Sequence, residues 1–166
     1  MALKSANTQE ALSRKYPESI ALAGVADENS KGNFIPLGWF MQTSHEPPML
    51  AISIGKTRYS HQLLKKAGEF TLGLPGENME EEVRYCGTHS GRDVNKIDKL
   101  GIEIMPAKKI NAPHAAKCVA SFECRLTASI ESGDHTIFTG EIVNAYISKE
   151  NSKKLYTLCH LKFGGL

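Results

Sequence analysis

The feature that most constrains the fold is a long alternating stretch in the C-terminal half of the chain. From Ala120 to Glu131, apolar and polar residues alternate without interruption. Because successive side chains of a strand point to opposite faces, this period predicts a strand with one buried and one solvated face. Residues 132–134, Ser-Gly-Asp, predict a turn, and His135 to Ile147 is the returning strand. A long antiparallel hairpin is therefore expected to close the sheet.

Shorter apolar runs bounded by turn residues predict the remaining elements. The predicted strands cover residues 20–27, 34–42, 49–54 and 70–74, and the predicted helices cover about 8–16, 60–67, 78–86 and 93–100. The expected helix caps are Thr8, Asn78 and Asp93. Pro36 and Gly38 indicate an edge, a bulge or a close backbone approach by a ligand. Consecutive hairpins with inserted helices favour a mainly β, α+β antiparallel barrel or sandwich over a doubly wound parallel sheet.

Length, composition and charge limit the classes of function. A chain of 166 residues with 41% hydrophobic and 23% charged residues predicts one globular domain, residues 1–166. The basic residues are scattered and the net charge is only +2, so no nucleic-acid partner is expected. No apolar run is long enough to cross a membrane, and residues 1–18 lack a secretory signal, which favours the cytoplasm. The four cysteines form no CxxC pair and, with the histidines, no metal-ligand set.

The segment SIGKTRYS, residues 53–60, is a candidate anion site at a helix start. Free backbone N–H groups at a helix start and the side chains of Lys56, Thr57, Arg58 and Ser60 would suit a monophosphate. The alternative is that a hydroxyl residue caps the helix and the cations are solvated. A P-loop is disfavoured because its first glycine would have to occupy the position of Leu50.

Three further features have both a binding and a structural interpretation. The loop in YCGTHSGRDVNK, residues 85–96, could add donors to the same anion or be an ordinary helix connection. Trp39 suits a planar aromatic ligand, but the sequence alone favours a core position, as for most large apolar side chains in strands. His135 stands at the mouth of the long hairpin, where it could reach a ligand or simply face solvent. No GxGxxG or GxSxG motif indicates a Rossmann site or a nucleophile elbow.

Several of these segments occur together in an order that resembles a known family. The segments are GNFIPLGWFMQTSHEPPMLAISIGKTRYSH, YCGTHSGRDVNK, AKCVASFECR and GDHTIFTGEIV. With them the chain resembles the flavin reductase-like, FMN-binding split-barrel family, and most closely its flavoredoxin type. The similarity runs from about Ile20 to Gly165. It implies a Greek-key-like antiparallel split β-barrel that forms a homodimer and binds FMN at or near the subunit interface.

The resemblance also implies which residues bind the flavin. Those expected beside the rings, along the ribityl chain and phosphate, in the SGRDxDK loop, at the GDH turn and near the C-terminus are Asn33, Leu37, Trp39, Phe40, Met41, Ser53, Gly55, Arg58, Ser60, Ser90, Gly91, Lys96, His135 and Phe163. The chain departs from the family pattern at Asn95, where the family commonly has Asp, and this departure bears on how Lys96 is oriented.

By the same resemblance, the expected activity is that of an FMN-dependent oxidoreductase. Electrons would pass from NADH, NADPH or a redox partner through FMN to another flavin or a protein acceptor, with His135 the one candidate for a catalytic side chain. The alternative is a non-enzymatic, flavoredoxin-type electron carrier with permanently bound FMN. A third interpretation is a flavin-binding or storage module without turnover.

Overall fold

A computed structural model describes residues 3–159 and 162–165 of the chain. The helical segments are α1 (Thr8–Leu12), η1 (Ser13–Lys15), α2 (Tyr59–Ala67), η2 (Glu77–Met79), α3 (Glu80–Thr88) and α4 (Lys96–Leu100). The strands are β1 (Glu18–Ser19), β2 (Ala21–Ala26), β3 (Gly32–Leu37), β4 (Phe40–His45), β5 (Pro48–Gly55), β6 (Glu69–Pro75), β7 (Ile104–Met105), β8 (His114–Ala115), β9 (Cys118–Ser132), β10 (His135–Ile147), β11 (Leu155–Cys159) and β12 (Lys162–Gly165).

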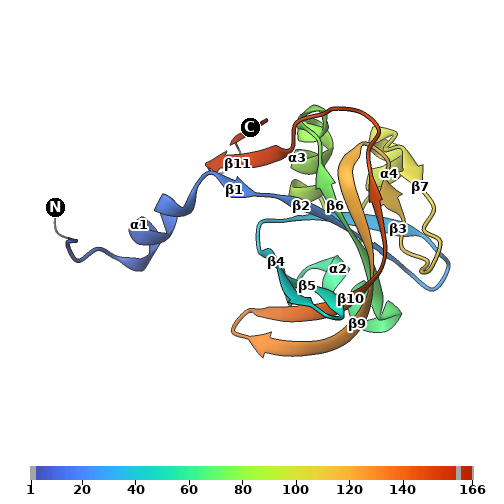
Figure 1. The fold of residues 1–166 in the computed structure, drawn as a ribbon, viewed down its shortest axis with the longest axis horizontal. Coiled ribbons are helices and arrows are strands. Elements are labelled where there is room, and N and C mark those ends of the chain that lie inside the picture. Colours follow the sequence, from blue (N-terminus) through green and yellow to red (C-terminus); the bar gives the residue numbers. More distant parts are fainter. Residues whose placement is uncertain (1–2, 160–161, 166) are drawn as a thin grey trace.

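The core of the fold is a seven-stranded antiparallel sheet with the order β3-β2-β6-β9-β10-β5-β4 (Figure 1). The order does not follow the sequence, because the late strands β9 and β10 insert between β6 and β5. The register shifts between Thr139 and Gly140 and again between Ile142 and Asn144, and such bulges bend and twist a sheet. The predicted mainly β fold with short inserted helices is confirmed.

The long hairpin is also confirmed, and it extends slightly beyond the predicted limits. β9 and β10 pair along most of their length, and Gly133 at the turn has a φ of 58°, in the left-handed region that favours glycine. Near the end of β9, burial no longer matches the apolar–polar alternation. Ile130 belongs to the apolar face, yet it is 61% exposed. The outer part of the hairpin therefore presents an uncovered apolar surface.

The predicted strand over residues 34–42 is wrong as a single element. The chain leaves β3 at Leu37 and begins β4 at Phe40, so β3 pairs with β2 whereas β4 pairs with β5 at the opposite edge of the sheet. Gly38 and Trp39 form the link, and the N–H of Ser53 donates to the Trp39 carbonyl at 2.9 Å. This crossing from one sheet edge to the other leaves the barrel split beside the link.

Three predicted helix caps are wrong, because none of the three helices has its N-cap at the predicted residue. Asn7 caps α1, with its Oδ1 accepting from the Glu10 N–H at 2.8 Å. A 3₁₀ turn precedes α3, so Asn78 lies inside that turn and α3 has no side-chain cap. Asn95 caps α4 through bonds from the N–H groups of Ile97 and Asp98. α3 also extends beyond the predicted end at residue 86, to Thr88.

The main core lies between the curled sheet and α2. Buried apolar side chains from five strands meet there with Leu63 and Leu64 of the helix: Ala23, Val25, Ile52, Ile54, Phe70, Leu72, Cys124 and Phe138. A second cluster holds α3 and α4 against β2 and β3 through Leu22, Phe34, Met79, Cys86 and Ile102. These two clusters fix the start of α2 and the loop after α3 relative to β3.

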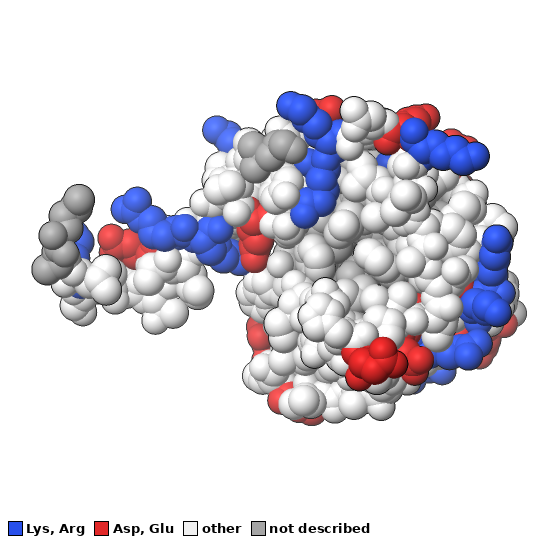
Figure 2. Space-filling view, in the orientation of Figure 1, with Lys and Arg blue, Asp and Glu red and all other residues white. Residues whose placement is uncertain are grey.

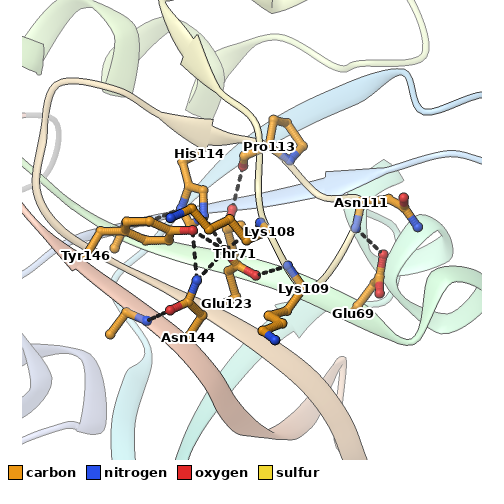
Figure 3. A network of polar contacts seen from close by, with 12 residues as sticks. Glu69, Thr71, Lys108, Lys109, Asn111, Pro113, His114, Glu123, Asn144 and Tyr146 are labelled. Carbon is orange, nitrogen blue, oxygen red and sulfur yellow. Dashed lines mark hydrogen bonds and ion pairs between the residues drawn. The ribbon is translucent and has the colours of Figure 1, made fainter.

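A buried carboxylate anchors the long loop between β7 and β8. Glu123 on β9 is fully buried, and its carboxylate accepts the backbone N–H groups of Lys108 at 2.9 Å and Lys109 at 2.7 Å (Figure 3). The Tyr146 hydroxyl and the Asn144 amide donate to the same carboxylate at 2.7 and 3.1 Å. Burial would raise the pKa of Glu123, but these donors outweigh it and lower the pKa to about 2. The loop is thus fixed by an ionised side chain.

Within the described ranges, no helix has the length and apolar character needed to cross a bilayer.

Candidate functional site

A cavity of about 360 Å³ lies at the split in the barrel. One wall is β3 with the Gly38–Trp39 link, the second is the end of β5 with the start of α2, and the third is the C-terminal turn of α3 with the following loop. The structure brings together at this cavity most of the residues expected from the sequence: Asn33, Leu37, Trp39, Ser53, Gly55, Arg58, Ser60, Ser90, Gly91, Lys96 and His135.

Three expected residues lie outside the lining of this cavity. Phe40 packs against the main core from β4, and Met41, its neighbour, is 62% exposed. Phe163 packs on the small cluster formed by Ile20, Val83 and Leu155, with the Arg84 guanidinium 5.2 Å from its ring centroid. Whether these three side chains touch a flavin therefore remains a prediction.

The charged side chains that line the cavity are all cationic. Arg58, Arg92 and Lys96 contribute three positive charges, and the lining includes no Asp or Glu. The guanidinium of Arg58 has no hydrogen-bond or ion-pair partner among residues 3–159 and 162–165. An arrangement of cations without a carboxylate favours an anionic ligand, because their mutual repulsion is relieved only by negative charge.

Lys96 is the buried member of this set. It is 4% exposed, and its Nζ donates to the carbonyl oxygens of Phe34 at 2.6 Å and Cys86 at 3.0 Å. Burial lowers the pKa of Lys96, and repulsion from Arg58 acts in the same direction. The ammonium group joins β3, α3 and α4 around the cavity. Asn95 orients this lysine only indirectly, by capping α4.

A tight contact holds the loop after α3 against β3. The Nδ2 of Asn33 donates to the Ser60 hydroxyl at 2.7 Å, and both side chains are buried. A Cβ atom on Gly91 would lie 2.2 Å from the Oδ1 of Asn33, which no side chain tolerates. Glycine at position 91 therefore allows the loop to approach the helix start so closely.

Lys56 does not join this cationic set, contrary to the prediction. Its Nζ forms an ion pair with Glu131 at 2.5 Å, and Lys56 is outside the cavity lining. The N–H of Lys56 also donates to the Asp134 carbonyl at 3.0 Å, which ties the turn after β5 to the hairpin turn. The side chain is directed to the hairpin because a carboxylate is available there.

An aromatic pair borders the same cavity beside Gly55. The rings of Trp39 and His135 have centroids 4.7 Å apart with an interplanar angle of 44°. The Nδ1–H of His135 donates to the Asp134 carboxylate at 2.7 Å, which leaves Nε2 as the nitrogen nearer the cavity. Trp39 is 52% exposed. It is thus not a core residue, which was the structural alternative for this side chain.

Tyr59 and His89 are among the lining residues that were not predicted from the sequence, although their neighbours were. Tyr59 stands between Arg58 and Ser60 at the first position of α2, and His89 directly precedes Ser90. The His89 ring stacks on the Tyr85 ring with centroids 3.8 Å apart. Adjacency to predicted residues in the same turn is the sequence signal that could have found both.

Cys86 also lines the cavity, but its chemistry is that of a neutral thiol. Burial raises its pKa to about 11, although the nearby Lys96 acts in the opposite direction. A protonated thiol is a poor nucleophile. Among the described residues, no three His, Cys, Asp or Glu side chains gather closely enough to hold a metal ion.

The comparison with family models decides what kind of domain this is. Residues 13–165 match the model of the flavin reductase like domain. The chain belongs to the flavin reductase-like family. Membership supports a flavin-related redox role, and the barrel folds of its structural neighbours agree with the architecture described above.

Similar proteins and solved structures lie at moderate sequence identity. An uncharacterised protein from Archaeoglobus fulgidus is 38% identical over 69% of this chain, and the match spans 64% of that relative's length. The NADH-dependent FAD reductase of Streptomyces globisporus is 28% identical over 78% of this chain and 70% of its own. A crystal structure of the FMN-binding protein from Thermus thermophilus superposes with a TM-score of 0.85 at 26% identity, covering 99% of this chain and 95% of that one.

Proposed function

We propose that this protein binds FMN in the cavity at the barrel split and is a flavin reductase-like oxidoreductase. It would take electrons from NADH or NADPH and deliver them to a second flavin or to a redox protein. The observation that carries the proposal is the convergence of Arg58, Arg92 and Lys96, without a carboxylate, beside the exposed Trp39–His135 pair.

The cationic side of the cavity fits the phosphate of FMN. A phosphate monoester carries nearly two negative charges at neutral pH, and charge-assisted hydrogen bonds are the strong ones. Arg58 supplies an unpaired guanidinium, and hydroxyl groups of Ser53, Ser60 and Ser90 line the same cavity. Lys96 adds positive charge where its Nζ donates to the Phe34 carbonyl of β3.

The other side of the cavity fits a flat ring system. Ile35, Pro36 and Leu37 provide an apolar wall that continues into Trp39. When bound, FMN supplies the electron and hydride chemistry, and the protein positions and shields it. The His135 Nε2 is placed to accept a hydrogen bond at the edge of a bound ring, so we assign it a positioning role.

The named relatives support a reductase in preference to a carrier. One of them is an NADH-dependent FAD reductase and another is a flavin reductase from Pseudomonas putida, 23% identical over 86% of this chain. The test is anaerobic stopped-flow with FMN-loaded protein. Bleaching of the oxidised flavin band on adding NADH or NADPH is the expected result. Absence of bleaching with both nicotinamides, together with reduction by a protein donor, would replace the reductase with the electron carrier.

We also propose that the protein is a homodimer. Large apolar side chains remain exposed on β4, on the outer hairpin and beside the cavity: Trp39, Met41 and Ile130. In the view of Figure 2 the middle of the molecule is a broad area with few charged side chains, and Lys, Arg, Asp and Glu lie mainly toward its margins. A second copy is the partner that exposed apolar side chains without charged neighbours favour.

The Ile130→Glu substitution tests this dimer. Light scattering after gel filtration should give twice 18.2 kDa for the native protein and 18.2 kDa for the variant, because a buried charge at the interface is costly. Ile104→Glu is the matched control, since Ile104 is 48% exposed but lies on β7, in a separate two-stranded sheet. A native protein that elutes at 18.2 kDa would contradict the proposal.

A further inference from the structure

Tyr59 separates two cavities. Its side chain lines the cavity at the barrel split and also a second cavity of about 530 Å³ between α2 and the turn that joins β2 to β3. The second cavity is lined by Ala26, Asp27, Glu28, Ser30, Gln62, Leu63, Lys66, Ala67, Glu69 and Asn111, in addition to Tyr59. A third space, which also touches Tyr59, measures only about 10 Å³, which is room for one water molecule at most.

Arg92 completes the separation. Its guanidinium lies 5.4 Å from the centroid of the Tyr59 ring, and its Nη1 donates to the Thr57 carbonyl at 3.1 Å. The loop after α3 also packs closely against the Tyr59 ring, because a Cβ atom on Gly91 would lie 2.9 Å from the Tyr59 Cδ1. We refer to Tyr59 and Arg92 together as the latch. It joins the start of α2 to the loop after α3.

The latch stands at the cationic end of the first cavity. Tyr59 is the immediate neighbour of Arg58 and Ser60, and Arg92 is itself one of the three cations. A terminal phosphate can be held there without passing the latch. A diphosphate is longer, and the second cavity lies on the other side of Tyr59 from the first.

We propose that Tyr59 and Arg92 are specificity-determining residues that make the site accept FMN and reject FAD. The inference rests on the proposed flavin function and names the form of the flavin. In this proposal the latch closes the direct way from the phosphate end of the first cavity to the second, so that the adenosine half of FAD cannot take it.

The second cavity has walls that would suit an adenosine once the latch is opened. One oxygen of Glu69 accepts the Asn111 N–H at 2.6 Å (Figure 3), and one oxygen of Asp27 accepts the N–H groups of Asn29 and Lys31. These bonds fix both carboxylates, and carboxylates are common partners of ribose hydroxyl groups. Opening the latch should therefore improve FAD binding instead of only weakening FMN binding.

The experiment measures the dissociation constants of FMN and FAD by calorimetry for the native protein and four variants. The native protein should prefer FMN by at least about tenfold, the scale of discrimination that a shaped site achieves. Tyr59→Ala should bring the two constants to within about threefold of each other, and Tyr59→Phe, which keeps the ring, should retain the native ratio. Because Tyr59 also packs on the core, Arg92→Ala, at an exposed position, tests the same latch and should tighten FAD binding itself, which the loss of a phosphate-binding cation would not do.

The double variant Tyr59→Ala/Ala67→Phe identifies where the adenosine lies. Ala67 lines only the second cavity, so a phenylalanine there should abolish the gain in FAD binding without changing FMN binding. If FAD binding stayed improved in the double variant, the adenosine would not lie in the second cavity, and that assignment would be wrong. Equal binding of both flavins by the native protein, or an unchanged ratio in both latch variants, would overturn the latch alone. Binding of neither flavin would overturn the proposed function and the latch with it.

Discussion

Replacing Arg58 with alanine should weaken FMN binding by about 1.5 to 3 kcal/mol, a factor of roughly 10 to 150 in the dissociation constant. Arg58 is the one cation of the cavity whose side chain has no hydrogen-bond or ion-pair partner within the described residues, so its charge is available to the ligand. Arg92 already donates to the Thr57 carbonyl, and Lys96 to two carbonyls. Isothermal calorimetry with the apoprotein measures the effect.

Lys56→Ala is the matched control for Arg58→Ala. Both residues are exposed cations of the same turn, but Lys56 is paired with Glu131 and lies outside the cavity lining. We expect its removal to change FMN affinity by less than about twofold, since a surface ion pair contributes little. Equal losses of FMN affinity in the two variants would show that FMN binding depends only on the overall positive charge of the turn. Unchanged affinity in Arg58→Ala would contradict the phosphate assignment.

Replacing Glu123 with glutamine should lower the free energy of unfolding by about 3 kcal/mol at pH 7. The carboxylate is fully buried and is stabilised by two backbone N–H groups of the β7–β8 loop, the Tyr146 hydroxyl and the Asn144 amide. An amide in its place offers one acceptor oxygen and brings an NH₂ group against these donors. Urea denaturation followed by circular dichroism measures the loss.

The same substitution should remove part of the acid sensitivity of the fold. Donors that outweigh the effect of burial lower the pKa of Glu123 from 4.5 to about 2 in the folded state. Its stabilising contribution is therefore complete above pH 4.5 and is lost as the pH falls from 4.5 toward 2. The stability difference between native protein and Glu123→Gln should narrow over that range. Glu141→Gln, at an exposed position on β10, should show no such change, and a constant difference for Glu123→Gln would refute the assignment.

The sequence predicted well the elements that depend on local pattern. Period-two alternation in residues 120–131 and the Gly133 turn are local signals, and they led to the β9–β10 hairpin almost at its true limits. The start of α2 was also placed within one residue, because the turn at Gly55 and the helix end at Gly68 bracket it. Such signals are sufficient where no distant segment competes.

Features that depend on pairing between distant segments were not predictable in this way. The break at Gly38 and Trp39 exists because the chain crosses from one edge of the sheet to the other, and hydropathy carries no information about that crossing. Lys56 and Arg58 are two cations of one turn. Glu131, 75 positions after Lys56, forms an ion pair with Lys56 but not with Arg58. The burial of Glu123 is equally invisible in the pattern, which places it on the solvated face of its strand.

It was the resemblance to the family that predicted that these separate segments form one site. Residues 33–60 and 85–96 read separately gave a helix start, a basic loop and an aromatic strand, each with a structural alternative. The structure places all three around one cavity. It does not bring Phe163 there, since β12 belongs to the small sheet beside α3.

The most direct test of the central claim is a titration of the purified apoprotein with FMN, followed by the absorption and fluorescence of the flavin. We predict saturable binding of one FMN per chain, with a perturbed flavin band and quenching of Trp39 fluorescence, because the rings lie beside this single tryptophan. A flavin spectrum and a Trp39 emission that do not change as FMN is added would contradict it.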